Sequence, residues 1–272
     1  MVAIRTSTAW TGFTPADPAP SGTVGLLALA TDAYIEFDLR GLLPPGVGMC
    51  TTRIANVEPL TVAALRATSA DITTAAGTIL PGQPLAALIY GCTAGAAIIG
   101  HDEVAGLLGA AKPEAHCLTP VGSVAAALRA LGVRRPAVLT PNLRQVNESI
   151  AGALAEEGFR LTGLTGFGIS QDADITRIPP HAVAEIAKGL CCPRTDGLLI
   201  CCTSLRSTPV IEELEQRLGL PVVTSNQALA WDVTRRLDLD DRPSGPGSLL
   251  RTSGEPVPAV PGLVPARPAT GG

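Results

Sequence analysis

The chain has 272 residues, a formal net charge of −4, and 46% hydrophobic but only 3% aromatic residues. A slightly acidic chain lacks the basic surface that binds nucleic acid or anionic lipid. Its apolar runs are far shorter than the ~20 residues of a membrane-spanning helix. We therefore expect neither nucleic-acid nor membrane partners. The N-terminus lacks the apolar segment of a secretory signal, which predicts a cytoplasmic protein.

The two ends of the chain differ from its middle. Residues 1–21 show no periodicity and are predicted to form a flexible N-terminal segment. Short apolar runs then predict strands at 23–30, 85–90, 137–140, 197–200 and 221–224. Apolar residues at helical spacing predict helices at 103–111, 121–131, 146–157, 209–218 and 228–237. The last part, 242–272, is rich in Pro and Gly and is predicted to be disordered.

Two segments far apart in the chain share one layout. In LAALIYGCTAG (85–95) and GLLICCTSLRS (197–207), an apolar strand runs into Cys-Thr, a small residue and a helical pattern. Short buried strands that alternate with helices indicate a parallel, doubly wound α/β sheet. The repeat predicts two similar lobes that face each other, although Ala- and Leu-rich strands can also resemble one another by coincidence.

The seven cysteines raise the question of which thiols are reactive. The sequence has no CxxC pair, so no metal site is predicted. Cys92 and Cys202 follow predicted strands and precede predicted helices, where open α/β sheets bind ligands. The free N–H groups and partial positive charge of a helix start favour a thiolate. We interpret the others as inert, buried thiols: Cys50, Cys117, Cys191, Cys192 and Cys201.

The two Cys-Thr blocks and the segment PVVTSNQALAWD (221–232) resemble the aspartate/glutamate racemase superfamily. Within it, they resemble the branch of maleate cis–trans isomerases, arylmalonate decarboxylases and ectoine-utilisation proteins. The stretch TVGLLALATDAYIEFDLRGLLPPGVGMCTTRI resembles the last group most closely. The resemblance implies two Rossmann-like lobes with pseudo-twofold symmetry, the active site in the cleft between them, and a homodimer. We divide the chain accordingly, into 22–117 plus 225–241 and 118–224.

The resemblance also implies cofactor-free chemistry at the carbon next to a carboxylate. Transferred residue by residue, it makes Cys92 and Cys202 the catalytic pair. The residues it implies for substrate binding are Thr31, Asp32, Thr93, Ala94, Asn142, Thr203 and Ser204.

Two of these positions depart from the family pattern. Asp32 stands where maleate isomerases have Asn, and an ionised carboxylate there repels a second substrate carboxylate unless it is protonated or paired. It could instead favour a substrate with an amino group, or cap the following helix. Asn142 stands where relatives often carry Tyr, and it could bind substrate or cap a helix. Ser225 and Asn226 leave the same alternatives, and Arg206 could bind a carboxylate or lie in solvent.

Two thiols on opposite sides of one carbon suit racemisation, by proton exchange, or cis–trans isomerisation, by covalent addition. A decarboxylase needs only one proton-donating Cys, so the pair favours an isomerase or racemase of a small carboxylic or amino acid. Two alternatives stay open. One is an arylmalonate decarboxylase-like lyase, and the other is a non-catalytic protein that binds a small carboxylate.

Overall fold

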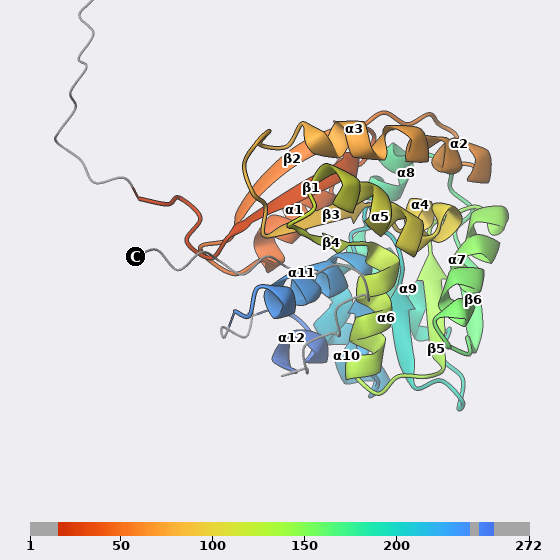
Figure 1. Ribbon diagram of the computed structural model, residues 1–272. Helices are drawn as coiled ribbons and strands as arrows, with labels where there is room; N and C mark the ends of the chain where they lie inside the picture. Colours follow the sequence, from red (N-terminus) through yellow and green to blue (C-terminus); the bar gives the residue numbers. More distant parts are fainter. Residues whose placement is uncertain (1–15, 240–244, 253–272) are drawn as a thin grey trace, which may run out of the picture.

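The computed structural model describes residues 16–239 and 245–252, whose strands form two parallel four-stranded sheets (Figure 1). The first sheet, in the order β2-β1-β3-β4, consists of β1 Thr23–Leu29, β2 Gly48–Ile54, β3 Ala87–Gly91 and β4 His116–Leu118. The second, in the order β6-β5-β7-β8, consists of β5 Pro136–Thr140, β6 Gly163–Gly166, β7 Gly197–Ile200 and β8 Val222–Thr224. Both sheets place their strands in the same relative order, which confirms the prediction of two similar α/β lobes.

Helices cover the sheets and fill the space between them. They are α1 Ile35–Leu42, α2 Val62–Ala67, α3 Ile72–Gly77, α4 Thr93–Ile99, α5 His101–Ala111, α6 Pro120–Ala130, α7 Arg144–Glu156, α8 Asp172–Arg177, α9 Pro180–Lys188, α10 Ile211–Leu218, α11 Ser225–Arg236 and α12 Ser248–Arg251. Two short 3-10 helices are η1 Thr68–Asp71 and η2 Thr208–Val210. Helix α3 packs on β1, β2 and α5, while α6 and α11 lie side by side and contact strands of the two sheets (Figure 1).

The strands that carry the two Cys-Thr pairs are buried along their whole length. Every residue of β3, β5 and β7 is buried, which explains why their sequences are continuous apolar runs rather than alternating ones. Gly91 ends β3 where the chain comes close to α1. A Cβ at this position would lie 2.9 Å from Cδ1 of Ile35, so glycine allows the close approach just before Cys92.

Most of the elements predicted from periodicity are confirmed. The five predicted strands correspond to β1, β3, β5, β7 and β8, and the five predicted helices to α5, α6, α7, α10 and α11. Strands β2 and β6 were not predicted, because as edge strands they are only partly buried and carry few apolar residues. Strand β4 was missed because only one of its three residues, Leu118, is buried, whereas the equally short β8 is buried throughout.

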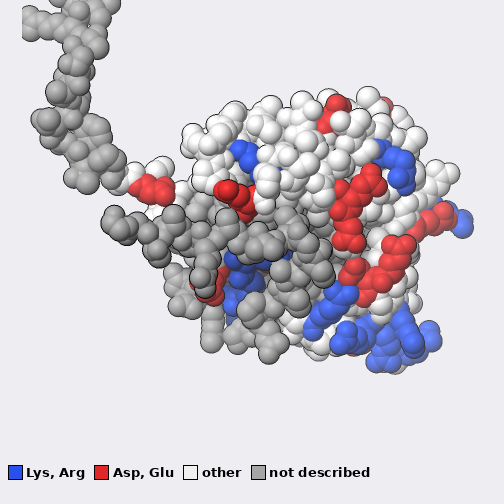
Figure 2. Space-filling view, viewed as in Figure 1, with Lys and Arg blue, Asp and Glu red and all other residues white. Residues whose placement is uncertain are grey.

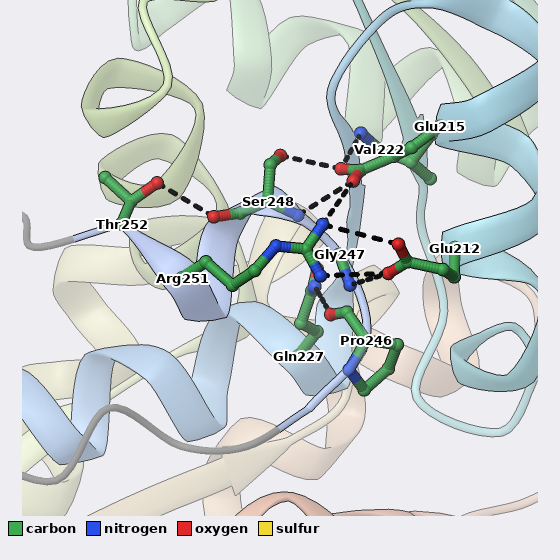
Figure 3. Close-up of polar contacts among 9 residues, drawn as sticks. All are labelled: Glu212, Glu215, Val222, Gln227, Pro246, Gly247, Ser248, Arg251 and Thr252. Carbon is green, nitrogen blue, oxygen red and sulfur yellow. Dashed lines mark hydrogen bonds and ion pairs between the residues drawn. The ribbon is translucent and has the colours of Figure 1, made fainter.

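The prediction of a disordered tail over 242–272 is wrong for residues 245–252, which form an ordered segment with α12. Leu249 and Leu250 are almost fully buried. The backbone N–H and hydroxyl of Ser248 donate to Glu215 at 2.8 and 2.7 Å, and the N–H of Gly247 donates to Glu212 at 3.0 Å (Figure 3). The rest of this predicted tail, and residues 1–15 of the predicted N-terminal segment, lie outside the described residues.

The molecular surface carries both signs of charge. On the face seen in Figure 2, acidic and basic side chains occur together, and uncharged atoms cover most of the upper part, where Figure 1 shows α2 and α3. Across 16–239 and 245–252, no helix combines the length and apolar character that crossing a bilayer requires.

Candidate active site

One small cavity is lined by residues from the two lobes. They are Leu29, Leu60, Leu65, Cys92, Thr93, Ala94, Asn142, Asp172, Cys202, Thr203 and Ser204. The cavity therefore brings together all the predicted site residues except Thr31 and Asp32, and these two are hydrogen bonded to its lining. Its volume is about 20 Å³, room for about one water molecule. A carboxylic acid can enter only if these walls move apart.

Cys92 lies directly after β3 and is the N-cap of α4. Its Sγ accepts a hydrogen bond from the N–H of Gly95 at 3.2 Å, the kind of contact predicted to favour a thiolate. Burial nevertheless outweighs this contact and raises the pKa of the Cys92 thiol to about 12, with further increases from the charges of Asp172 and Asp32. The expectation of a readily formed thiolate is therefore wrong for this closed cavity.

Cys202 lies two residues beyond the end of β7, but no helix begins at it. The segment up to Ser207 is irregular, and η2 begins only at Thr208. The prediction of a helix start at Cys202 is wrong: the hydroxyl of Thr203 bonds to Asp32 of the opposite lobe, and that of Ser204 bonds to Asp172 of its own lobe. Burial, followed by the charges of Asp172 and Asp32, raises the pKa of the Cys202 thiol far above its ordinary value.

Two pairs of hydroxyl and carboxylate groups connect the lobes beside the thiols. The Thr203 hydroxyl donates to Asp32 at 3.0 Å, across from the second lobe to the first. The Thr31 hydroxyl of the first lobe donates in the opposite direction, to Asp172. Ser204 also donates to Asp172, at 2.9 Å. The hydroxyl groups expected to hold a substrate carboxylate thus bind carboxylates of the protein itself.

Asp32 supports the start of α1, which is one of the roles that the sequence left open. One of its carboxylate oxygens accepts the N–H groups of Tyr34 and Ile35, at 2.8 and 3.0 Å, where α1 begins. The other accepts the hydroxyl of Thr203. It is 1% exposed, so the side chain that supports the helix start also contributes charge next to both thiols.

The start of α11 supports both Cys-Thr pairs, which decides the question left open for Ser225 and Asn226. Thr224 caps this helix together with Gln227 in a capping box, so neither of them serves as the cap. Ser225 accepts the hydroxyl of Thr93 at 2.9 Å. Asn226 donates its amide to the carbonyl of Thr203 at 2.9 Å.

The remaining predicted positions separate into lining and non-lining residues. Asn142 lines the cavity, and its side chain does not cap α7, whose N-cap is Leu143. Arg206 does not line the cavity. Burial raises the pKa of Tyr34, and the charge of Arg206 partly offsets this increase. Cys201 is buried and does not line it either, as expected for an inert thiol.

Asp172 is the polar group in the cavity that sequence reasoning missed. It is the first residue of α8 and only 3% exposed. Burial raises the pKa of its carboxyl group, while the hydroxyls of Thr31 and Ser204 lower it. The acidic segment DADIT gave a weak signal of a helix start, but nothing in the sequence connects it with cysteines distant in the chain. Within residues 16–239 and 245–252, no three His, Cys, Asp or Glu gather as ligands for a metal ion.

The sequence of this chain matches a known protein family and several characterised relatives. The family model described as arylmalonate decarboxylase (Amdase) matches residues 106–250. The maleate isomerase of Nocardia farcinica is 27% identical over 242 residues, which cover 84% of this chain and 95% of the relative. The arylmalonate decarboxylase of Bordetella bronchiseptica is 38% identical over 121 residues, covering 44% of this chain and 50% of the relative.

Solved structures agree over most of the chain. One is a Cys-to-Ser variant of the Nocardia farcinica maleate cis–trans isomerase with a covalently bound succinylcysteine intermediate. It aligns with a TM-score of 0.78 at 25% identity, over 84% of this chain and 98% of that one. A crystal structure of arylmalonate decarboxylase aligns with a TM-score of 0.69 at 26% identity, over 84% and 99%.

Two parallel-sheet lobes, each bringing a Cys-Thr pair to one shared cavity, define the class of two-lobed folds related to the aspartate/glutamate racemases. The match over 106–250 spans more than half of the sequence. The chain belongs to the arylmalonate decarboxylase family, in the superfamily that also includes the maleate isomerases.

Proposed function

We propose that the protein is an isomerase- or racemase-type enzyme that acts, without a cofactor, next to the carboxylate of a small carboxylic or amino acid. The observation that carries this proposal is that Cys92 and Cys202 line one cavity from strand ends of two different sheets. The maleate isomerase relatives support it, because one of their structures holds a substrate-derived group on a cysteine. This function rests on cysteine chemistry shared by isomerases and lyases of the superfamily.

In the proposed mechanism, the two thiols react at opposite faces of one substrate carbon. In racemisation, one sulfur in its thiolate form takes the proton next to the carboxylate, and the other thiol returns a proton to the opposite face. In cis–trans isomerisation, a thiolate instead adds to the double bond, which becomes a rotatable single bond until the sulfur leaves. Both routes require the pair to hold one proton rather than two. Burial raises the pKa values of Cys92 and Cys202 and so favours the protonated form of both thiols while the cavity holds no substrate.

The resemblance of residues 23–54 to ectoine-utilisation proteins supports a substrate from ectoine breakdown. We further propose that the protein acts in the cytoplasm as a homodimer. The cavity suits an amino acid better than it suits maleate. The maleate isomerase relatives have a second carboxylate to bind, whereas this cavity already contains the Asp172 carboxylate.

Proton NMR in deuterated water tests the proposed function with a panel of maleate, aspartate, glutamate, an arylmalonate and diamino acids. The expected result is isomerisation, or deuterium entry next to the carboxylate, that is lost in both Cys92→Ala and Cys202→Ala. The matched control is Cys117→Ala, because Cys117 is half-buried in β4 and does not line the cavity. Turnover that survives in either cavity variant would exclude a two-thiol mechanism.

A decarboxylase is the second candidate, favoured by the family match and by the local identity to the Bordetella bronchiseptica enzyme. That reaction needs a proton donor on one face only. Release of carbon dioxide from an arylmalonate that persists in Cys92→Ala and stops in Cys202→Ala would support it. Binding of carboxylates with no turnover of any kind would instead favour a non-catalytic carboxylate-binding protein.

A further inference from the structure

Asp172 is the ionisable side chain, other than the two thiols, that lines the described cavity. Its carboxylate accepts the hydroxyls of Thr31 and Ser204, one from each lobe, and its own N–H donates to Glu58 at 2.8 Å. The lining residues named above include no Lys, Arg or His. The charge of Asp172 is therefore held in place by neutral groups and is not neutralised by a cation of the lining.

The hydroxyl groups increase this negative polarity. The hydrogens of Thr31 and Ser204 are directed to Asp172, and that of Thr203 to Asp32. The Thr31 oxygen already accepts the amide of Asn56 at 2.9 Å, so the oxygens of Thr203 and Ser204 are the ones left to act as acceptors in the cavity. A site that binds two carboxylates needs donors in these places. This arrangement instead offers a fixed negative charge with acceptor oxygens, which is the environment that a protonated amine prefers.

Two basic side chains of the first lobe, Arg53 and Arg66, are already engaged; Arg66 donates to the carbonyl of Ile98. Arg53 pairs with Glu36 and donates to the backbone carbonyls of Leu29 and Asp32, at 3.0 and 2.6 Å. Asn142, by contrast, lines the cavity and carries an amide that can donate to a carboxylate. The cavity therefore combines a receptor for one carboxylate with a receptor for one cation.

We infer that the substrate carries a cationic nitrogen beside its carboxylate, and that Asp172 is the specificity-determining residue that binds this nitrogen. The inference rests on the proposed function and gives its substrate class: amino-bearing carboxylic acids rather than plain dicarboxylic acids. A bound ammonium group also balances the charge of Asp172, and this charge is one of the causes that disfavour ionisation of both thiols. A second carboxylate would act in the opposite direction.

Calorimetric binding to the full-length protein tests the inference with pairs of compounds that differ in one amino group. Aspartate is compared with succinate, and 2-aminobutyrate with butyrate, using both enantiomers of each amino acid; 2,4-diaminobutyrate and maleate complete the set. We expect the amino-bearing member to bind at least ~10-fold more tightly to the wild type, the gain from one charge-assisted hydrogen bond. Asp172→Asn should remove that preference. The matched control is Asp174→Asn, an exposed position on the same helix, which should retain it.

Equal or tighter binding of succinate or maleate to the wild type overturns the inference and would identify Asp172 as a protonated donor to a carboxylate. An unchanged preference in Asp172→Asn, or no binding of any amino-bearing compound, overturns it as well. The wild-type comparison stands even if the Asp172→Asn protein does not fold. Because these are binding ratios, they separate from the proposed function: an amine preference without cysteine-dependent turnover contradicts the enzyme and leaves the inference intact.

Discussion

The hydroxyl of Thr203 donates to the carboxylate of Asp32 at 3.0 Å and so connects the residue after Cys202 to the end of β1 in the other lobe. Both side chains are at most 3% exposed. The same hydroxyl lies 3.2 Å from the carbonyl of Gly91, next to Cys92. The side chain of Thr203, the residue after Cys202, therefore also contacts the residue before Cys92.

Thr203→Val should lower the free energy of unfolding by about 1–3 kcal/mol, because it removes a donor from the buried carboxylate of Asp32. Urea denaturation followed by circular dichroism measures the change. Thr176→Val is the matched control, since the hydroxyl of Thr176 is buried without a partner among the described residues. The control should be neutral or stabilising. Equal losses in the two variants would show that the connection to Asp32 contributes nothing.

Cysteine alkylation should follow the pKa values of the thiols. Hydrogen bonds from Thr195 and from the backbone of Arg194 lower the pKa of Cys192 to about 7, so this thiol is about half ionised at neutral pH. The interpretation of Cys192 as an inert thiol is therefore wrong. Cys92, with a pKa of about 12, has roughly one thiolate in 10⁵ at pH 7. Iodoacetamide at pH 7 should therefore label Cys192 first, as mapped by peptide mass spectrometry. Cys117 is the control, because it is half-buried like Cys192 but has a pKa of about 11, and early labelling of Cys92 or Cys117 would contradict the assignment.

Asp32→Asn should make Cys92 more reactive. The negative charge of Asp32 raises the pKa of the Cys92 thiol, so its removal lowers that pKa and increases the thiolate fraction at a given pH. The amide oxygen can still accept the N–H groups of Tyr34 and Ile35, which keeps the start of α1. The alkylation rate of Cys92 between pH 8 and 10 should rise several-fold. Asp102→Asn, at an exposed position on α5, is expected to leave the rate unchanged, and a change there of similar size would refute a local charge effect.

Glu215→Ala should destabilise the protein by about 2–3 kcal/mol. The Glu215 side chain is 11% exposed and accepts the N–H of Val222 in β8 and two groups of Ser248 in α12. Its removal leaves these donors without their acceptor and weakens the packing of the buried side chain of Leu249. Thermal unfolding measures the effect against Glu213→Ala on the same helix, whose exposed ion pairs with Lys188 and Arg217 contribute less than about 1 kcal/mol. A loss in the control as large as that in Glu215→Ala would assign the effect to the helix rather than to the α12 contacts.

The sequence predicted the fold well because its signal is local. Buried parallel strands appear as apolar runs, so β3, β5 and β7 could be recognised, and the repeated Cys-Thr layout indicated two lobes. Helix α12 could not be predicted, because Leu249 and Leu250 form a single apolar pair in a Pro- and Gly-rich stretch, and their burial depends on contacts made elsewhere in the fold.

The candidate site was predictable only where a motif marks it. Cys92 and Cys202 lie in recognisable blocks and meet at one cavity. Asp172 precedes no such motif, and it reaches the cavity through the placement of α8, which no spacing in the sequence reveals. The thiol pKa values were predicted in the wrong direction for a similar reason: a helix start is a local feature, whereas burial and two acidic side chains distant in sequence are not.

The first two residues of α11 restrict how far the two Cys-Thr pairs can move relative to each other. Ser225 is hydrogen bonded to Thr93, and Asn226 to Thr203, the residues that directly follow the two cysteines. The first turn of α11 therefore helps to fix the distance between Cys92 and Cys202. The contacts of Thr203 with Asp32 and of Thr31 with Asp172 join the lobes at the same cavity, so a rotation that opens it also strains these bonds. The N–H of Leu60, a lining residue of the first lobe, donates to the carbonyl of Ser170 in the second lobe at 2.8 Å and joins the lobes once more. The separation of the two cysteines therefore depends on the same contacts that hold the two lobes together.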